Sequence, residues 1–364
     1  MNASPPPRSS ELAALGVCQA LIGSSKTPPR QILCTSIGRG QIARGLWRQN
    51  PTAAVTLVYL DQFQQQQTIA DHESEMQTVG SDDRLSIICA ADLPDAAPGG
   101  DAFDLAVIPC SVRGEAELQR DLLQQAHQRL AIGGWLVSSV DHVKDKWLHE
   151  QMKSLGAKVS VVHTETSAVY TVCKTEPLKR IRSFDCEFSF RDAGQTVLAF
   201  SRPSVFSHRH LDGGAAALIQ AATVAPGEWV IDVGCGAGVV AIAIAKREPS
   251  AHVYAVDGNV RAIESTRRGA ELNGLTNVTT RLTCEGHCDR PATYDLALCN
   301  PPYYSNFRIA ALFVDTARRA LKPGGRILVV TKHAAWYQEN MYPGWRDIVV
   351  DQGRQYAIVR AIRG

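Results

Sequence analysis

Long hydrophobic runs are missing from this sequence. None of its uninterrupted apolar stretches reaches the length that crosses a membrane, which predicts a chain without membrane spans. The first ten residues are rich in proline and serine and lack the apolar core of a secretion signal, so we expect a cytoplasmic protein. Paired cysteines are missing too. The ten cysteines are scattered singly along the chain, which favours reduced thiols over a disulfide framework.

Metal-ligand spacing is also lacking. The closest cluster of suitable residues is Cys284, His287 and Cys288, and no pair elsewhere in the sequence completes it at ligand spacing, so we expect no metal site. The length, by contrast, is ample. A chain of 364 residues can form two domains that each bury a core, and 45% hydrophobic with 20% charged residues is ordinary for a soluble globular protein.

One pattern that is present is a predicted strand followed by a glycine-rich turn. Trp229–Val233 is apolar, the turn Gly234–Gly238 carries three glycines, and 239–246 is predicted to be a helix. Glycines in such a turn let the backbone approach a ligand closely at a helix N-terminus. A second predicted strand, 252–256, ends in Asp257, where an acid can hydrogen-bond a ribose hydroxyl. This half of the chain is therefore predicted to bind a nucleoside.

A dinucleotide-binding turn is the alternative interpretation, because its fingerprint also follows a strand and ends at a ribose acid. That fingerprint places its last two glycines three residues apart. Here the glycines stand at 234, 236 and 238, and Val239 comes next. The pyrophosphate-binding pattern is therefore incomplete.

The second informative pattern is the turn that follows 294–299. This short apolar run is typical of a buried central strand, and Pro301 cannot extend it because proline lacks an N–H. The chain must therefore leave the sheet at Asn300. Ligands of open α/β sheets bind at that edge, outside the carboxyl ends of the strands. Taken alone, the segment is also compatible with a proline-rich turn that has incidental aromatic residues.

The residue types in this turn suit methyl transfer onto a planar amine. An exocyclic amine of a base has its lone pair conjugated into the ring, and the Asn300 side-chain oxygen and the Pro301 carbonyl can each accept one of its two hydrogens. Such contacts hold the nitrogen and direct its lone pair at a methyl donor. Pro301 and Pro302 stiffen the turn, and Tyr303 offers a face on which an extruded base can stack.

These motifs together resemble the class I S-adenosylmethionine-dependent methyltransferases over residues 200–335. Asp232–Gly238 resembles the first motif of that family, Asp257 its ribose acid, 284–286 its adenine-side turn, and Asn300-Pro301-Pro302-Tyr303 its amino-methyltransferase motif. The resemblance implies S-adenosylmethionine as the cofactor. The residues that it implies for cofactor binding are Phe206, Asp212, Asp232, Gly234, Cys235, Gly236, Gly238, Asp257, Gly258, Asn259, Glu285 and Asn300.

The two halves of the chain repeat one pattern. Phe103–Val107 matches 294–298 at an offset of 191, while Gly38, Gly40 and Asp61 match Gly234, Gly236 and Asp257 at an offset of 196. A repeat of this length indicates two copies of one domain. We therefore expect an α/β fold with two tandem Rossmann-like methyltransferase domains, 1–175 and 176–364, each a mostly parallel seven-stranded sheet flanked by helices.

The copies differ where chemistry is expected. At an offset of 196 Ser36 replaces Asp232, and at 191 the segment 109–112, Pro-Cys-Ser-Val, replaces the Asn300 turn. We infer that the first copy keeps the fold and has lost cofactor binding and catalysis. The alternative is a second active site of different specificity. Charge is also uneven, with 15 Lys and Arg against 18 acids in 1–175 and 23 against 18 in 176–364, which suits a polyanionic substrate for the second copy.

A degenerate first copy followed by a complete second copy resembles the ribosomal RNA guanine-N2 methyltransferases. The resemblance implies methyl transfer to the exocyclic N2 amine of a guanine in ribosomal RNA or a ribosomal subunit, with the first copy aiding RNA binding, and we expect a monomer. Two other substrates stay open, adenine N6 in DNA and a glutamine amide in a protein, because both present a planar amine. A non-catalytic RNA-binding assembly factor is the alternative from another class.

Overall fold

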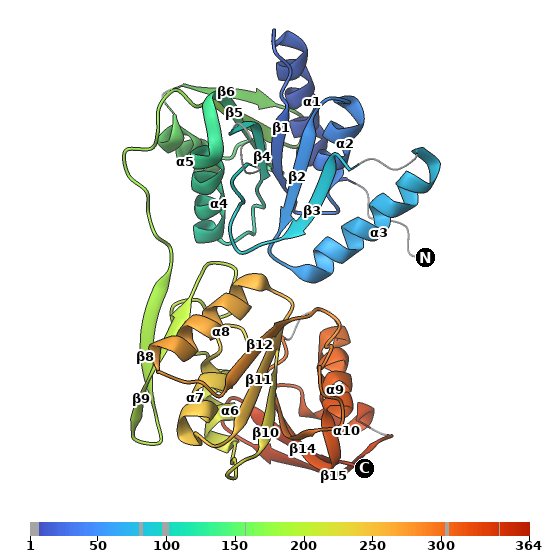
Figure 1. Cartoon of the computed structure of the whole chain (residues 1–364), viewed down its shortest axis with the longest axis vertical. Coiled ribbons are helices and arrows are strands. Elements are labelled where there is room, and N and C mark those ends of the chain that lie inside the picture. Colours follow the sequence, from blue (N-terminus) through green and yellow to red (C-terminus); the bar gives the residue numbers. More distant parts are fainter. Residues whose placement is uncertain (1–6, 80–82, 97–101, 157, 303–305, 342) are drawn as a thin grey trace. The chain divides into compact units, whose positions relative to one another are not determined.

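A computed structural model describes residues 7–79, 83–96, 102–156, 158–302, 306–341 and 343–364, and it divides the chain into two compact units, Met1–Phe184 and Asp185–Gly364 (Figure 1). The division falls later than the predicted boundary at 175. The side chain of Gln124 explains why, because it accepts the N–H of Arg182 at 2.8 Å and donates to the carbonyl of Arg182 at 2.9 Å. This clamp fixes the connecting segment to the first unit.

The first unit is a seven-stranded sheet with helices on both faces. Its strands are β1 (Gln31–Thr35), β2 (Ala54–Tyr59), β3 (Leu85–Cys89), β4 (Phe103–Pro109), β5 (Leu130–Val140), β6 (Val159–His163) and β7 (Ala168–Cys173), in the order β3-β2-β1-β4-β5-β7-β6. All neighbours pair in parallel except β7, which is antiparallel to both β5 and β6. Its helices are α1 (Ser9–Ser24), α2 (Gln41–Gln49), α3 (Gln62–Val79), α4 (Ala116–Arg129) and α5 (Trp147–Leu155).

The second unit begins with a hairpin, β8 (Cys186–Asp192) and β9 (Gln195–Ser201), and continues as a sheet of the same order, β12-β11-β10-β13-β14-β16-β15. The sheet strands are β10 (Trp229–Val233), β11 (His252–Asp257), β12 (Val278–Leu282), β13 (Tyr294–Cys299), β14 (Leu321–Thr331), β15 (Trp345–Gln352) and β16 (Ala357–Arg363). The helices are α6 (Gly213–Ala221), α7 (Val239–Arg247), α8 (Val260–Leu272), α9 (Arg308–Ala320) and α10 (Ala334–Asn340). The expected fold class, two tandem Rossmann-like domains with mostly parallel seven-stranded sheets, is confirmed.

Each sheet is buried on both faces, which explains why its central strands read as continuous apolar runs. Side chains alternate between the faces along a strand. In β10, Val230 joins the core beneath α6, α7 and α8, whereas Ile231 and Val233 join the core beneath α9 and α10. Figure 1 shows these helices on either side of the sheet. Among the described residues, no helix combines the length and the apolarity needed to cross a membrane.

The strand registers correct the alignment of the first two strands between the copies. β1 begins at Gln31 and β10 at Trp229, while α2 begins at Gln41 and α7 at Val239, so this part of the repeat runs at an offset of 198 and the expected 196 is wrong. The strand pairing agrees, since Gln31 pairs with Ala54 and Trp229 with His252. Gly38 and Gly40 therefore correspond to Gly236 and Gly238.

Four further correspondences follow from the offset of 198. Ser36 corresponds to Gly234, and Cys34, rather than Ser36, corresponds to Asp232. Tyr59 stands at the position of Asp257, and Asp61 at the position of Asn259. The last pair shares a role, because the Asp61 carboxylate accepts the N–H of Gln64 at the start of α3 and the Asn259 side chain accepts the N–H of Arg261 at the start of α8.

Candidate active site

The candidate site lies at the carboxyl edge of the second sheet, where the strand order reverses between β10 and its neighbours. β10 pairs in parallel with β11 on one side and β13 on the other. Gly234 follows β10, Asp257 ends β11 and Asn300 follows β13, so the three segments singled out by sequence meet at one edge. Such a switch point leaves a crevice that ligands occupy in open α/β sheets.

The three glycines of the turn after β10 have different tasks, although all have positive φ angles of 54° to 74°. A Cβ on Gly234 would lie 2.2 Å from the ring of Phe313 in α9, and one on Gly238 would lie 2.6 Å from Thr266 in α8. These two glycines allow helices to pack against the turn. A Cβ on Gly236 would meet only Phe206, at 3.8 Å or more. Gly236 therefore leaves space beside the turn for a ligand.

Asp257 is tied to this turn by its carboxylate. One oxygen accepts the N–H of Gly236 at 2.9 Å and the other accepts the N–H of Asn259 at 2.8 Å. Its side chain is half-buried, so the carboxylate is oriented at the edge of the open space beside Gly236. This places the expected ribose acid and the open glycine together. Gly258 lies between the two anchored residues.

Two side chains, from Asn259 and Arg261, hold the segment that carries Phe206 beside the turn. The fully buried guanidinium of Arg261 donates to the carbonyl of Pro203 at 3.0 Å, and the Asn259 amide donates to the carbonyl of Ser204 at 3.1 Å. Ser204 itself has a φ of 82°, an uncommon conformation for a residue with a side chain. Phe206 is 63% exposed, so its ring covers no core and is available to cover a ligand beside Gly236.

Asn300 is oriented by Asp212. The Nδ2 of Asn300 donates to Oδ2 of Asp212 at 3.1 Å, and the same carboxylate oxygen accepts the N–H of Ala215 as the N-cap of α6. Gly214 makes room for this pair, since a Cβ there would lie 2.9 Å from the Asp212 carboxylate and 3.0 Å from Oδ1 of Asn300. With its amide nitrogen held in this way, Asn300 retains its side-chain oxygen as a hydrogen-bond acceptor.

Asp232 and Cys235 shape the turn from behind. Asp232 is 3% exposed and its carboxylate accepts the N–H of Ala241 in the first turn of α7. Burial raises the pKa of Asp232 to about 7. Cys235 is also buried, its sulfur accepts the Thr266 hydroxyl at 3.3 Å, and burial raises the pKa of its thiol. The structure thus places these two side chains in the core and leaves their backbone at the turn.

The segment after β12 forms the far side of the crevice. The N–H of Thr283 donates to the carbonyl of Asp257 at 2.8 Å, and Arg319 donates to the carbonyl of Glu285 at 2.9 Å. Gly286 has a φ of 63°, and a Cβ there would lie 1.8 Å from Oγ1 of Thr316. The turn is therefore fixed by its backbone while the Glu285 side chain stays exposed. Among the described residues, no group of close ligand atoms includes Cys284, His287 and Cys288.

The remaining predicted residues follow Asn300 directly. Pro301 is buried and Pro302 half-buried. Tyr303 lies outside the described residues, so its predicted role as a stacking face stays a prediction. The described chain resumes at Asn306 and Phe307, both with positive φ angles, and Phe307 is the N-cap of α9.

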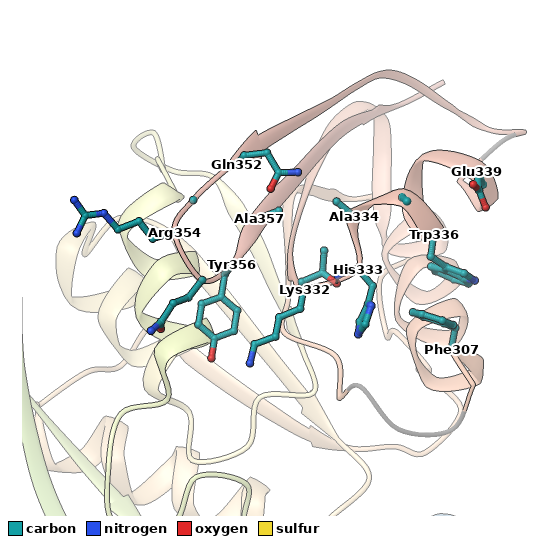
Figure 2. A pocket seen from close by; sticks show the side chains of 14 residues that line it. Phe307, Lys332, His333, Ala334, Trp336, Glu339, Gln352, Arg354, Tyr356 and Ala357 are labelled. Carbon is teal, nitrogen blue, oxygen red and sulfur yellow. Dashed lines mark hydrogen bonds between the residues drawn. The ribbon is translucent and has the colours of Figure 1, made fainter.

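Sequence reasoning missed a pocket beside this edge. Its cavity of about 540 Å³ lies between the end of β14, the start of α10 and the β15–β16 hairpin, and we call it the β14–β16 pocket (Figure 2). Its aromatic and cationic lining consists of Phe307, Lys332, His333, Trp336, Arg354 and Tyr356. The available signal was position, because 332 and 333 follow a strand at the same edge as Asn300.

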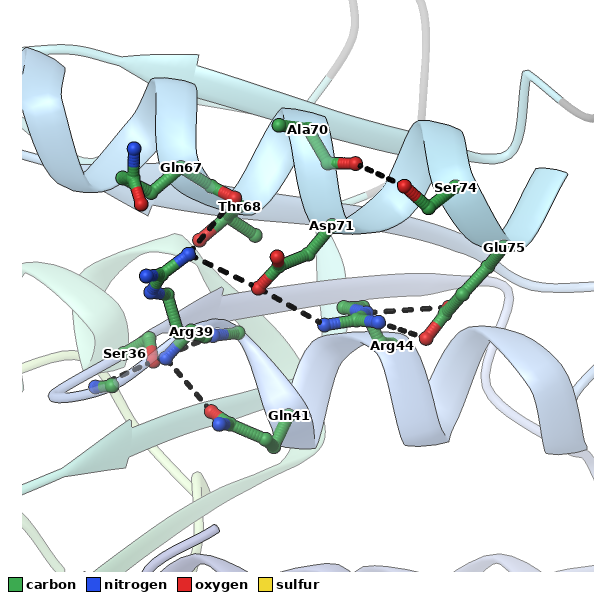
Figure 3. A network of polar contacts seen from close by, with 12 residues as sticks. Ser36, Arg39, Gln41, Arg44, Gln67, Thr68, Ala70, Asp71, Ser74 and Glu75 are labelled. Atoms are coloured by element: carbon green, nitrogen blue, oxygen red, sulfur yellow. Dashed lines mark hydrogen bonds and ion pairs between the residues drawn. The ribbon is translucent and has the colours of Figure 1, made fainter. Parts of the chain in front are cut away.

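The corresponding turn of the first unit is filled by its own side chains (Figure 3). The Ser36 hydroxyl oxygen accepts the N–H groups of Gly38 and Gly40, each at 3.0 Å. Ser36 in turn donates to Glu11 at 3.3 Å, and a Cβ on Gly38 would lie 3.1 Å from the Glu11 carboxylate. Glu11 is 1% exposed, and burial raises the pKa of its carboxyl. A buried carboxyl thus lies beside Gly38, whereas the space beside Gly236 is open.

The comparisons with known proteins agree with this geometry. The family model described as methyltransferase small domain matches residues 196–360. The chain is 29% identical over 230 residues to ribosomal RNA large subunit methyltransferase G of Shewanella amazonensis, which covers 60% of this chain and 58% of that protein. It is 30% identical over 179 residues to ribosomal RNA small subunit methyltransferase C of Hahella chejuensis, which covers 46% of this chain and 50% of that protein. The matches thus span only about half the length of these relatives.

A solved structure is similar over nearly the whole chain. It is the T. thermophilus 16S rRNA N2 G1207 methyltransferase, RsmC, in complex with AdoMet and guanosine, with a TM-score of 0.72 and 21% identity. The similarity covers 96% of this chain and 92% of that one. At this identity the comparison bears on the fold, and it confirms the tandem arrangement of two domains.

Proposed function

We propose that this chain, whose residues 196–360 match the family model described as methyltransferase small domain, transfers a methyl group from S-adenosylmethionine to the exocyclic N2 amine of a guanine in ribosomal RNA. The observation that carries the proposal is the Asn300 amide, whose nitrogen is held by Asp212 at the edge where Gly236 leaves open space. The names of both relatives, as ribosomal RNA methyltransferases, support the substrate class. The AdoMet and guanosine bound by the T. thermophilus protein support the cofactor and the base.

The residues at the edge fit a nucleoside cofactor. Gly236 provides space for close approach, the Asp257 carboxylate at its side suits a ribose diol, and the exposed Phe206 ring suits an apolar cover. Glu285 stands beyond Asp257 on a fixed turn, where we place the adenine. Residues Asp232, Gly234, Cys235 and Gly238 act in this proposal by holding the turn in shape.

In the mechanism, S-adenosylmethionine supplies a methyl group already activated on a sulfonium sulfur. Oδ1 of Asn300 and the carbonyl of Pro301 accept the two hydrogens of the guanine amine, which fixes the nitrogen and directs its lone pair toward the methyl group. Pro302 stiffens the turn, and Tyr303 stacks on the base. The surplus proton of the amine passes to water after transfer. Orientation of this kind supplies about 7–11 kcal/mol in well-aligned intramolecular reactions.

Asp212 is a positioning residue in this scheme. Its carboxylate accepts the Asn300 nitrogen, and this contact prevents the amide from rotating its nitrogen toward the substrate. A rotated amide would present donors to an amine that also donates, so the two groups would repel. The N-cap contact of Asp212 with Ala215 anchors the carboxylate to α6. In this proposal the start of α6 is therefore coupled to the orientation of the Asn300 amide.

We further propose that the protein works in the cytoplasm as a monomer and that the first unit contributes to binding ribosomal RNA or a ribosomal subunit without holding a cofactor. The cations Lys179, Arg180 and Arg182 support an RNA contact there. Together with Arg120 and Lys153 they line a cavity of about 530 Å³ in the first unit. Clusters of cations of this kind bind phosphates of the nucleic-acid backbone.

The test is to delete the gene and to map the modified nucleotides of ribosomal RNA by mass spectrometry. We expect one N2-methylguanine to disappear and to return when the purified protein and S-adenosylmethionine are added to the unmodified RNA or subunit. Loss of a methylated adenine in DNA, or of a methylated glutamine in a protein, would contradict the proposal. An unchanged methylation pattern together with no calorimetric binding of S-adenosylmethionine would favour an assembly factor instead.

A further inference from the structure

We propose that the β14–β16 pocket binds a nucleotide of the RNA strand that neighbours the methylated guanine. The inference rests on the proposed function and names the part of the substrate that this second cavity takes. The pocket belongs entirely to the second unit, and its volume of about 540 Å³ is in the range of small-ligand sites. Its lining combines aromatic rings with cations, the pairing that unpaired RNA requires.

The pocket adjoins the catalytic amide through the start of α6. A Cβ on Gly213 would lie 3.2 Å from the ring of Tyr356, a pocket residue, and a Cβ on Gly214 would lie 3.0 Å from Oδ1 of Asn300. Two consecutive residues thus face the pocket and the amide. Phe307 provides a second link between the two places, because it lines the pocket and is the N-cap of α9, the next helix in the sequence after Asn300. A strand whose guanine reaches Asn300 passes directly beside the pocket.

Aromatic rings form two sides of the pocket (Figure 2). Phe307 and Trp336 stack with centroids 4.9 Å apart and planes within 6°, and His333 meets Phe307 edge-on at 5.6 Å. Tyr356 lies across the pocket from this pair. Trp336 and Tyr356 are half-buried, so each is fixed by packing while part of its surface stays accessible. Rigid, partly open rings are suitable platforms for stacking an unpaired base.

The charge of the pocket favours a phosphate. Lys332, His333 and Arg354 are exposed cationic or titratable groups, and Glu339 is the acid among the lining residues. Lys332 lies 5.1 Å from the Tyr356 ring, so its ammonium is held where a stacked nucleotide would place its phosphate. Arg360 on the same hairpin is different, because it forms an ion pair with Asp351 at 2.6 Å and does not line the pocket.

The first unit has the same fold but, among its described residues, lacks the cation and the cavity found after β14, so the fold itself does not require them. The residue after β5 is Asp141, and the residue after the equivalent strand β14 is Lys332. Asp141 accepts the hydroxyl of Ser9 at 2.9 Å and the N–H of Ser10 at 2.8 Å, so the start of α1 occupies this place. In the second unit the charge at the same position is reversed and the place is hollow. The difference points to a negatively charged ligand.

The test uses the full chain with Arg354→Ala as the principal variant and Arg360→Ala as the control that removes an equal charge from the same hairpin. The substrate is ribosomal RNA from cells that lack the gene. We expect Arg354→Ala to raise the KM for RNA about tenfold, as loss of a nucleotide contact does, and to leave kcat and the Kd for S-adenosylmethionine unchanged. The slope of log KM against log salt concentration falls by about one for each phosphate contact removed. Arg360→Ala keeps the wild-type KM and slope.

Trp336→Ala supplies an independent test of stacking. It raises the KM for RNA without changing the salt slope, and thermal unfolding verifies that the variant is folded. A wild-type KM in both Arg354→Ala and Trp336→Ala would overturn the inference. A KM effect that appears with assembled subunits and vanishes with naked RNA would also overturn it, because the pocket would then hold a ribosomal protein.

Failure of the proposed function is measured separately. Fluorescence anisotropy with a labelled single-stranded oligoribonucleotide needs no turnover. If the wild-type protein transfers no methyl group to either naked RNA or assembled subunits, but Arg354→Ala weakens binding of the oligonucleotide, the proposed function is rejected and the RNA site is supported. If transfer occurs and neither KM nor oligonucleotide binding depends on Arg354, the function stands and the RNA site falls.

Discussion

The two halves of the chain have the same strand order, but they differ in how they stabilise the turn after the central strand, β1 in the first unit and β10 in the second. In the first unit the Ser36 hydroxyl accepts two N–H groups of the turn and the buried Glu11 lies beside it. In the second unit the Asp257 carboxylate accepts the N–H of Gly236 and the space next to that glycine is open. A polar turn must have its hydrogen bonds satisfied in either case. The comparison teaches that the same turn can be stabilised by side chains that fill the space beside it or by a carboxylate that leaves this space open.

The residues that follow β4 and β13 also differ between the two units. After β4 the first unit places Cys110, which is buried, lies 3.5 Å from the Ser138 hydroxyl, and has its thiol pKa raised to about 12 by burial. After β13 the second unit places Asn300, which is half-buried and bonded to Asp212. One end closes the core and the other presents an amide. Both units share the same sheet, and they differ in the loops at its carboxyl edge, where functional residues of such folds lie.

The largest expected effect comes from Asn300→Ala, which removes the amide that the first unit lacks. We expect kcat for RNA methylation to fall roughly 10²- to 10³-fold, the range found when a single preorganised polar contact to the reacting group is lost. Calorimetry should give a Kd for S-adenosylmethionine close to that of the wild type. Ser111→Ala, in the loop after β4, is the matched control in the first unit and keeps full activity. Near-normal turnover by Asn300→Ala would reject the assignment.

The next effect concerns the cofactor and separates the two turns. Asp257→Asn should weaken S-adenosylmethionine binding about 10- to 100-fold, because hydrogen bonds to charged groups are worth about 1.5–3 kcal/mol. Tyr59→Phe changes the equivalent position of the first unit, where the hydroxyl donates to the carbonyl of Gly38 at 3.4 Å and contacts Thr68 at 2.7 Å. It should leave cofactor binding unchanged. Weakened binding in Tyr59→Phe would place a cofactor in the first unit and break the comparison.

A smaller effect tests how Asn300 is oriented. Asp212→Ser keeps an N-cap for α6, since serine also accepts the N–H groups of a first turn, but it is too short to accept the Asn300 nitrogen in the same geometry. We expect kcat to fall about tenfold, which corresponds to the loss of roughly one hydrogen bond. The melting temperature should stay within a few degrees of the wild type. A loss of activity that tracks a loss of helical content would indicate that Asp212 only caps α6.

Much of the second unit could be predicted from its sequence because its signals are local. The apolar runs at 229–233 and 294–299 are strands, Pro301 ends the second one, and the three segments meet at one edge as expected. The expected resemblance to ribosomal RNA methyltransferases is confirmed by the family model and the relatives. These features depend on hydrophobic runs, glycine and proline, which act within a few residues.

The offset between the copies could not be predicted for a related reason. The glycines recur every second residue and strand side chains also alternate every second residue, so a slip of two positions keeps glycine over glycine and each apolar residue on its face. Only the pairing of Gln31 with Ala54 and the start of α2 fix the offset at 198. The β14–β16 pocket was missed because Phe307, Trp336 and Tyr356 come from three separate segments. Tertiary packing brings these three residues together, and no local sequence pattern indicates that contact.

The smallest expected effect is a pH dependence confined to the second unit. Burial raises the pKa of Asp232 from its ordinary 3.8 to about 7, while the equivalent residue of the first unit is the buried Cys34, uncharged at neutral pH. A raised folded-state pKa means that the stabilisation is complete below about pH 4 and is lost as the pH rises through 7. Hydrogen exchange around β10 should show a lower free energy of opening at pH 8 than at pH 5, and Asp232→Asn should abolish that difference. Exchange around β1 serves as the internal control, and an equal pH effect there would show that burial of Asp232 is not its cause.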